Sequence, residues 1–421
     1  MQRKDILELK KRFKKDKCTF TNMSGCYVND EKKIISKFSE FFLNLDEDEL
    51  FKYLEIAKKV LSGTLGNNIL ELNFPLDEDF TNETQTSLQQ LKRSRLKDEG
   101  LLDVFYELII DHYDYEGNFL ILLFHDAYDV MTKTTDNQKL DESEEVYEYV
   151  LCALCPVSLS EPGLTYVEQE DKIKSRIRDW VVGPPVNGFV FPAFIDRSSD
   201  VNAVMYYTKN PKDPHPELME DILGCHPKQT ATLQKETFQS VVKASLGVEE
   251  EQADMIFMDV QENLNIMVDE YNALYDDTDH DPITLSKNHI QDLLIESGIP
   301  EEATARIENS YTENFADELP LAASLIDKKI LKASAQVQKE KTLIKQIGML
   351  ETKLREATQN TTSDNDDENV EDKGAIPAIV LQVKAEKVSE IRSQVIDGQK
   401  CIVIPVNEDE EARVNGLDHL I

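Results

Sequence analysis

Five short apolar segments between residues 118 and 208 constrain the fold of this chain more than any other feature. They contain β-branched and aromatic residues and are bounded by Gly, Pro or polar residues, which is typical of buried strands. No regular helical pattern separates each pair, as a parallel sheet would require. The pattern therefore predicts an α+β fold with a mainly antiparallel central sheet. The expected strands are Phe119–Phe124, Tyr147–Leu159, Thr165–Val167, Phe189–Ile195 and Val201–Thr208.

Helical periodicity dominates on both sides of these segments. Near the N-terminus we expect a basic first helix, helices at 31–43 and after Asp46, and a longer one at 86–112. The small C-terminal module is expected to contain strands at 379–383 and 400–406 around a helix at 385–395. The expected division is an N-terminal helical region at 1–115, an antiparallel sheet at 116–215, a helical region at 216–358, an acidic linker at 359–374 and a βαββ module at 375–421.

Apolar residues recur at heptad spacing in the last long helix of the helical region. A partial heptad predicts either packing against the same chain or an oligomeric coiled coil, and the sequence leaves both open. One seam position holds Ile330, Val337 and Ile344, and the other holds Ala333, Ile347 and Leu354, with Glu340 as an interruption.

The charge balance restricts the partners of the chain. It has 81 Asp and Glu residues against 46 Lys and Arg residues, a formal net charge of −35. Phosphate backbones and anionic membranes need cationic counter-charge, so we expect no direct binding to nucleic acid or to a membrane surface. Two interpretations remain: a solvated surface that keeps the protein soluble, or an acidic surface that mimics nucleic acid or captures a basic partner.

Other features of the sequence predict a cytoplasmic protein. No segment reaches the roughly 18 consecutive apolar residues that span a bilayer, and Met1–Lys17 lacks the apolar core of a signal peptide. The six cysteines are sparse and irregularly spaced, which fits reduced thiols better than a disulfide framework. Oligomeric state is left open.

The common catalytic and cofactor motifs are absent from the sequence. It contains no P-loop, no dinucleotide-binding fingerprint, no nucleophile elbow and no helical zinc motif. Cys152 and Cys155 form a Cys-x-x-Cys, but they lie in an expected strand, where their thiols would point to different faces. We therefore expect buried, inert cysteines, no bound metal and no cofactor, and we assign no catalytic residue.

Residues 176–185 form the most distinctive stretch, with the only tryptophan, two arginines and a double proline. Arg and Trp are favoured anchors at binding sites, and the planar guanidinium suits a carboxylate or phosphate ligand. The predicted hairpin loop 196–200 could lie nearby. The alternative is an ion-paired loop that packs its tryptophan on the sheet. The candidate ligand-binding residues are Arg176, Arg178, Asp179, Trp180, Asp196 and Arg197.

Several short motifs resemble those of a known bacterial family, the domain-of-unknown-function family 4317. The resemblance covers nearly the full chain and implies a bacterial, cytoplasmic protein, but it brings no activity, cofactor or catalytic residue. The motifs are Lys17–Thr21, Gly25–Val28, Ser62–Gly66, Cys155–Val157, Arg178–Gly183, Gly188–Phe194, Tyr206–Asn210, Val395–Gly398 and Val414–Gly416.

The sequence supports three hypotheses about function. The leading one is a cytoplasmic, non-enzymatic interaction or regulatory protein with an unidentified protein partner. The first alternative is a protein or enzyme that binds a small anion or nucleotide through the region of Arg178, Asp179 and Arg197. The second alternative is an acidic mimic of nucleic acid, which requires negative charge along one face.

Overall fold

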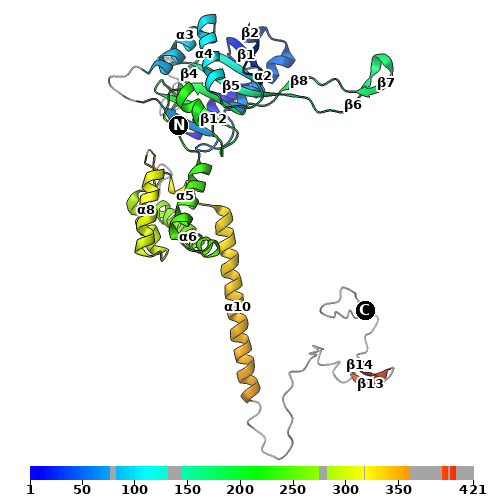
Figure 1. Cartoon of the computed structure of the whole chain (residues 1–421), viewed down its shortest axis with the longest axis vertical. Coiled ribbons are helices and arrows are strands. Elements are labelled where there is room, and N and C mark those ends of the chain that lie inside the picture. Colours follow the sequence, from blue (N-terminus) through cyan, green and yellow to red (C-terminus); the bar gives the residue numbers. More distant parts are fainter. Residues whose placement is uncertain are drawn as a thin grey trace, which may run out of the picture. The chain divides into compact units, whose positions relative to one another are not determined.

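The computed structural model describes residues 1–75, 82–130, 145–274, 282–316, 318–360, 391–396 and 399–403. The chain divides into two compact units, Met1–Leu343 and Ile344–Ile421. The first unit contains a sheet covered by helices and a helical bundle, which are coloured blue to green and green to yellow in Figure 1. Among the described residues, no helix is both long and apolar enough to cross a membrane.

The sheet of the first unit is antiparallel and has eight strands, which confirms the predicted fold class. Its order is β2-β1-β4-β5-β9-β12-β3, and β8 pairs with the end of β5. The predicted partners at 189–195 and 201–208 do pair, through Met205 and Val190. The strands are β1 Asn22–Val28, β2 Ile34–Phe41, β3 Ile69–Asn73, β4 Asn118–Val130, β5 Glu145–Leu159, β8 Trp180–Val182, β9 Asn187–Phe191 and β12 Ala203–Thr208.

A separate hydrophobic core lies on each face of the sheet. One face packs against α1 (Arg3–Arg12) and α2 (Glu47–Val60). The other packs against α3 (Glu83–Arg93), α4 (Glu99–His112) and the short π-helix Leu218–Ile222. Because side chains alternate along a strand, Cys152 and Cys155 fall in different cores, as predicted. Both thiols are free, and burial raises the pKa of Cys155 to about 12, so it stays protonated.

The predicted helix at 31–43 is wrong, because strand β2 occupies most of that range. Strand β1 is buried between β2 and β4, and its pairing supplies the backbone hydrogen bonds that a helix would have made locally. The Phe38 ring lies over Gly25, where an added Cβ would approach the ring to 2.2 Å. Strand β2 therefore depends on its contact with another segment, β1, and the periodicity of its own sequence does not indicate that contact.

The predicted helix at 86–112 is also wrong in one respect, because it is broken into α3 and α4. Arg95 and Leu96 both adopt positive φ angles in the turn between them. Leu96 is buried there, and the Asp98 carboxylate accepts hydrogen bonds from the backbone N–H groups of Gly100 and Leu101. An Asp that caps a new helix start is a signal the sequence does carry.

The predicted helical region at 216–358 forms a bundle with its own core. Gln261 is fully buried and bridges two segments, since its amide donates to the Leu325 carbonyl and accepts from the Asp327 N–H. The helices are α5 Ala231–Leu246, α6 Glu250–Leu274, α7 Lys287–Glu296, α8 Glu301–Asn314, α9 Ala322–Leu325 and α10 Lys328–Asn360.

The first turns of α10 pack against the bundle. Ile330 contacts the bundle core, and Ser334 and Gln338 donate hydrogen bonds to the Glu262 carboxylate. From Leu343 onward the apolar side chains of the described seam are exposed, for example 68% for Ile344. A coiled coil formed by this helix stays a prediction.

The C-terminal unit is described only for α10 after Ile344 and for the antiparallel pair β13 (Arg392–Ile396) and β14 (Gln399–Val403). β14 confirms the strand expected at 400–406 over its described part. β13 corrects the end of the helix expected at 385–395. The expected linker after Asn360 and the strand at 379–383 lie outside the described residues, and the expected five-region division stays a prediction.

Candidate functional site

Residues 160–179, here called the arm, leave the sheet between β5 and β8. The arm contains strands β6 (Leu164–Val167) and β7 (Lys172–Ser175), which pair with each other and, among the described strands, with no other. Figure 1 shows the arm as a thin ribbon that reaches away from the sheet beyond β8. At its tip the Tyr166 hydroxyl donates a hydrogen bond to the Asp171 carboxylate, which holds the turn closed.

The two faces of the arm differ in chemistry. Tyr166 pairs with Ile173, and Leu164 pairs with Ser175. Residues opposite one another share a face, and so do residues two apart in a strand. Leu164, Tyr166 and Ile173 therefore share one face with Ser175, and Ile177 follows two residues after Ser175, beyond the end of β7. Leu164, Tyr166, Ile173 and Ile177, here called the apolar face, are 75, 55, 62 and 85% exposed. The other face carries Thr165, Val167, Lys172 and Lys174, and Arg176 follows after the end of β7.

Hydrogen bonds fix the base of the arm to the end of β5. The Arg178 guanidinium donates to the carbonyl oxygens of Ser160, at 2.7 Å, and Leu159, at 3.4 Å. The Asp179 N–H donates to the Ser160 hydroxyl, and the Asp179 carbonyl accepts from the Ser160 N–H. Trp180 then begins β8 with 56% of its surface exposed. Arg178 thus stabilises the arm by binding backbone carbonyls.

The structure places the other two candidate residues elsewhere. Asp196 and Arg197 form the tight turn between β10 (Ala193–Ile195) and β11 (Ser198–Asp200), with φ angles of 47° and 64°. Both face α1, since Asp196 pairs with Lys4 and Arg197 pairs with Glu8, each at 3.2 Å. Arg176, Arg178 and Asp179 lie on the arm, and Trp180 follows them at the start of β8. No contact described for these residues joins them to Asp196 and Arg197.

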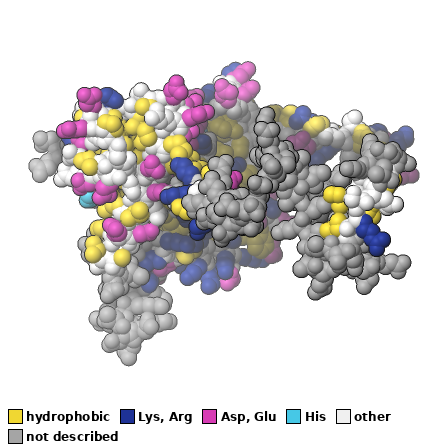
Figure 2. All heavy atoms as spheres, turned by 90° about the horizontal axis from the view of Figure 1, so that it is seen from below, with side chains coloured by type: hydrophobic (Ala, Val, Ile, Leu, Met, Phe, Trp, Pro, Cys, Tyr) yellow, Lys and Arg dark blue, Asp and Glu magenta, His cyan; other side chains and the backbone are white. Residues whose placement is uncertain are grey.

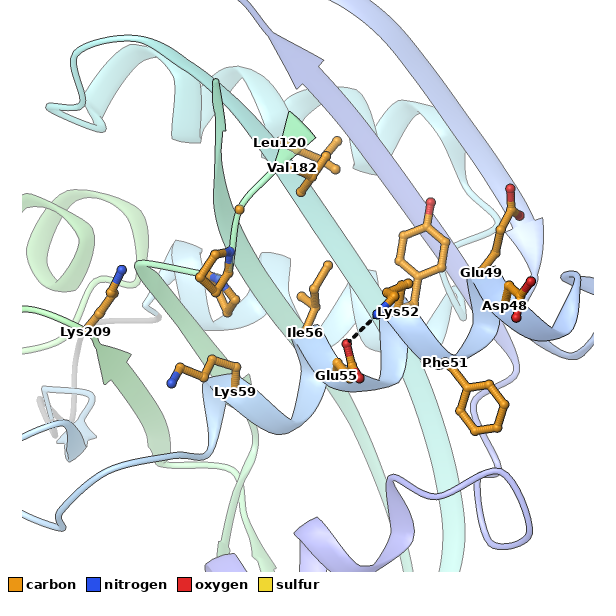
Figure 3. Close-up of a pocket in the computed structure, with 14 residues that line it drawn as sticks. Asp48, Glu49, Phe51, Lys52, Glu55, Ile56, Lys59, Leu120, Val182 and Lys209 are labelled. Atoms are coloured by element: carbon orange, nitrogen blue, oxygen red, sulfur yellow. Dashed lines mark hydrogen bonds and ion pairs between the residues drawn. The ribbon is translucent and has the colours of Figure 1, made fainter. Parts of the chain in front are cut away.

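An open groove of about 1160 Å³, here called the α2 groove, lies beside the base of the arm. One wall is α2, and the other is formed by Val182 at the end of β8 and the segment 183–185 that follows it. Figure 3 shows its layout: Lys59 and Lys209 lie at one end, Asp48 and Glu49 at the other, and apolar side chains such as Ile56 and Val182 lie between. Sequence reasoning missed this groove because its residues come from four separate parts of the chain.

The charges at the ends of the α2 groove are only partly neutralised within the chain. Lys52 pairs with Glu55 at 3.2 Å, but in the described part of the chain no carboxylate pairs with Lys59 or Lys209. Burial and the nearby ammonium groups of Lys59 and Lys58 lower the pKa of Lys10, so positive charge is concentrated at this end of α2. The groove can therefore hold an elongated, largely apolar ligand with opposite charges along it.

A buried polar network around His125 was not identified from the sequence. The imidazole Nδ1 lies 2.7 Å from the Thr21 hydroxyl and its Nε2 lies 3.1 Å from the Glu148 carboxylate. Next to it, the Asp126 carboxylate accepts hydrogen bonds from the hydroxyls of Thr19 and Tyr149. The network ties the segment before β1 to β4 and β5. His125 has no exposed surface and does not line the α2 groove, so we assign the network to stability.

Acidification is expected to destabilise the protein through His125. Burial lowers the native-state pKa of His125, against the opposing effect of Glu148, while the unfolded chain has a pKa of about 6.5. Below that pH the unfolded state binds the proton more readily, so the free energy of unfolding falls, by at most about 1.4 kcal/mol per pH unit. Urea unfolding from neutral pH to about pH 5.5 measures this slope. The His125→Gln variant should show a flatter profile, and equal slopes would exclude His125 as the cause.

The described residues contain no group of three His, Cys, Asp or Glu side chains that could hold a metal ion. The fold and its surface features define an α+β protein in which a two-stranded arm stands beside an open groove. The model of the family described as "Domain of unknown function (DUF4317)" matches residues 1–417, so the chain belongs to that family. A comparison with curated proteins finds no match.

Proposed function

We propose that this chain is a non-enzymatic interaction protein that docks onto a partner through its arm. The observation that carries the proposal is the apolar face of Leu164, Tyr166, Ile173 and Ile177, each more than half exposed on one side of a ribbon. Contiguous exposed apolar surface of this kind marks interaction sites in soluble proteins. A partner that buried this face would stabilise the complex by roughly 1.5–3 kcal/mol for each large apolar side chain.

The proposed location is the cytoplasm of a bacterium. Cys26, Cys152, Cys155 and Cys225 are free thiols and are buried among apolar side chains. Free thiols of this kind fit a reducing compartment. The family assignment adds no activity to this proposal.

The two alternative functions receive less support. An anion site would need Arg178 and Arg197 to converge on one ligand. Arg178 instead donates to the carbonyl oxygens of Leu159 and Ser160, and Arg197 pairs with Glu8. Mimicry of nucleic acid would need an uninterrupted row of acidic groups. On the face shown in Figure 2, hydrophobic, basic and uncharged side chains separate the Asp and Glu side chains. The solvated-surface interpretation of the net charge fits this face better.

Removing the apolar face should abolish docking and leave the fold intact. The arm variant combines Leu164→Ser, Ile173→Ser and Ile177→Ser, all at exposed positions. In affinity purification of the tagged full chain from native lysate, the wild type should retain a stoichiometric partner, either a second copy or another protein. The arm variant should retain at least about tenfold less, because each lost side chain removes more than 1 kcal/mol of burial.

A matched control carries the same number of substitutions at exposed apolar positions away from the arm. Such changes should leave both recovery and thermal unfolding unchanged. A wild-type chain that stays monomeric and retains no partner would refute the proposal, as would equal recovery by the arm variant. The control substitutions are Ile35→Ser, Val104→Ser and Ile295→Ser, at side chains that are 57, 64 and 58% exposed.

A further inference from the structure

We infer that the arm docks into the α2 groove of a second copy of this chain, and that two chains exchange arms reciprocally. This inference rests on the proposed function and names the partner of the same surface. It requires that arm and groove lie side by side on one chain, that their apolar surfaces match, and that their charges are complementary.

The first requirement is met by continuity of the chain. The arm ends where β8 pairs with β5, and the next residues, Val182 to Pro185, form a wall of the α2 groove. Arm base and groove are therefore neighbours on each copy. Around a twofold axis, an arm that leaves beside its own groove can enter the groove of the partner, whose arm returns the contact. A twofold interface of this kind closes and does not propagate into filaments.

The second requirement concerns the apolar surfaces. The floor and walls of the α2 groove include Ile56, Leu120 and Val182, and both Pro184 and Pro185 add rigid apolar surface. The apolar face of the arm presents Tyr166 and three aliphatic side chains. A two-stranded ribbon fits an open groove better than a closed cavity, because its outer face stays solvated while its inner face is buried.

The third requirement concerns charge. The tip of the arm carries Glu168, Glu170 and Asp171, and Glu170 pairs with Lys174 within the arm. Glu168 and Asp171 are therefore left to complement Lys59 and Lys209 at one end of the groove, with which no carboxylate of the described residues pairs. The opposite end of the groove is acidic. If the ribbon lies along the groove with its tip at the lysine end, Arg176, near the base of the arm, lies toward the acidic end.

The groove's acidic end, Asp48 and Glu49, complements Arg176, which follows β7 near the base of the arm. The long side chain of Arg176 can extend over the edge of the ribbon to the groove rim. Local complementarity is needed because two copies of a chain with net charge −35 repel each other over the rest of their surfaces.

The occupant is a second copy because the arm of the same chain leaves its own groove open. Pairing of β8 with β5 and the hydrogen bonds of Arg178 hold the arm base in place. Ile177, close to that base, remains 85% exposed. The chain thus presents both halves of a contact and does not join them itself.

Photo-cross-linking of the full chain tests the inference directly. Tyr166 is replaced by p-benzoylphenylalanine, and isotopically light and heavy chains are mixed before irradiation. We expect cross-linked peptides that combine light and heavy chains and join position 166 to residues 48–59 or 182–185. The same amino acid at Val104, which is 64% exposed on α4, is the matched control and should give no such product.

Charge reversal provides a second test that does not depend on the cross-linker. A groove variant, Lys59→Glu with Lys209→Glu, and an arm-tip variant, Glu168→Lys with Glu170→Lys, should each weaken self-association at least about tenfold. In a mixed dimer of the two variants both contacts again join opposite charges, one as in the wild type and one with the signs exchanged, so mixing should recover dimer in light scattering. Failure of the mixture to recover any dimer would contradict the proposed pairing of charges.

The outcomes separate this inference from the proposed function. A purified chain that stays monomeric at all concentrations, or gives only cross-links within one chain, overturns the second-copy inference. If position 166 then cross-links to a different protein in lysate, docking through the arm stands with another partner. If it cross-links to no other chain in either setting, both the inference and the proposed function fail.

Discussion

Replacement of Gly188 by alanine is expected to lower the free energy of unfolding by about 3 kcal/mol. Gly188 is the second residue of β9, and an added Cβ would stand 2.5 Å from the backbone oxygen of Cys152 and 3.1 Å from both γ-methyl groups of Val60. The carbonyl belongs to the neighbouring strand, where Ala153 pairs with Gly188, so it cannot move without disturbing the ladder. Urea unfolding monitored by circular dichroism measures the loss.

The control for this substitution is Gly163→Ala at the base of the arm. Nothing lies within 4 Å of a Cβ built on Gly163, so this change should stay within about 0.5 kcal/mol of the wild type. An equal loss in both variants would show that steric contact at Gly188 is not the cause of the loss. Because Val60 lies in α2, the Gly188 variant should also displace one wall of the groove.

The sheet could be predicted from the sequence where its strands are buried on both faces. Residues 119–124 of β4 and 149–157 of β5 are continuous apolar segments, and that pattern needs no knowledge of their partners. β1 and β2 could not be predicted in the same way, because β1 contains Ser24 and Gly25 and most of β2 is exposed. What makes them strands is the ladder to β4 and the Phe38 ring over Gly25, and both are contacts between distant segments.

The candidate site was predictable to the extent that it lies in one continuous segment. The Arg and Trp content of residues 176–180 predicted a ligand-binding site at the base of the arm, and that site stays a prediction. The alternation of Lys172, Ile173 and Lys174 is the sequence pattern that indicates the two faces of the arm. The position of Arg197 was not predictable, because it depends on where the turn after β10 meets α1. The α2 groove was not predictable either, since Lys209 reaches it only once β12 has joined the sheet.

Replacement of Asn187 by alanine is expected to cost about 3 kcal/mol of stability, from a lost hydrogen bond, an unsatisfied hydroxyl and a small cavity. Asn187 is 1% exposed at the start of β9. Its amide oxygen accepts from the Tyr113 hydroxyl and its amide nitrogen donates to the Tyr206 hydroxyl, both at 3.0 Å. Tyr206 keeps a partner after the change, because its hydroxyl donates to the Pro214 carbonyl at 2.6 Å. Tyr113 loses the acceptor it uses in the native state.

This asymmetry makes the prediction testable by a double-mutant cycle measured with urea unfolding. With Tyr113→Phe in the background, Asn187→Ala should cost about 1–2 kcal/mol less than in the wild type, since no hydroxyl is left unsatisfied. With Tyr206→Phe in the background, the cost of Asn187→Ala should fall by less. The reason is that the Tyr206 hydroxyl keeps its hydrogen bond to the Pro214 carbonyl whether or not Asn187 is present. Equal coupling to the two tyrosines would contradict the hydrogen-bond directions on which the prediction depends. A coupling confined to Tyr113 would establish that α4, which ends at His112 next to it, is held on the sheet through this buried amide.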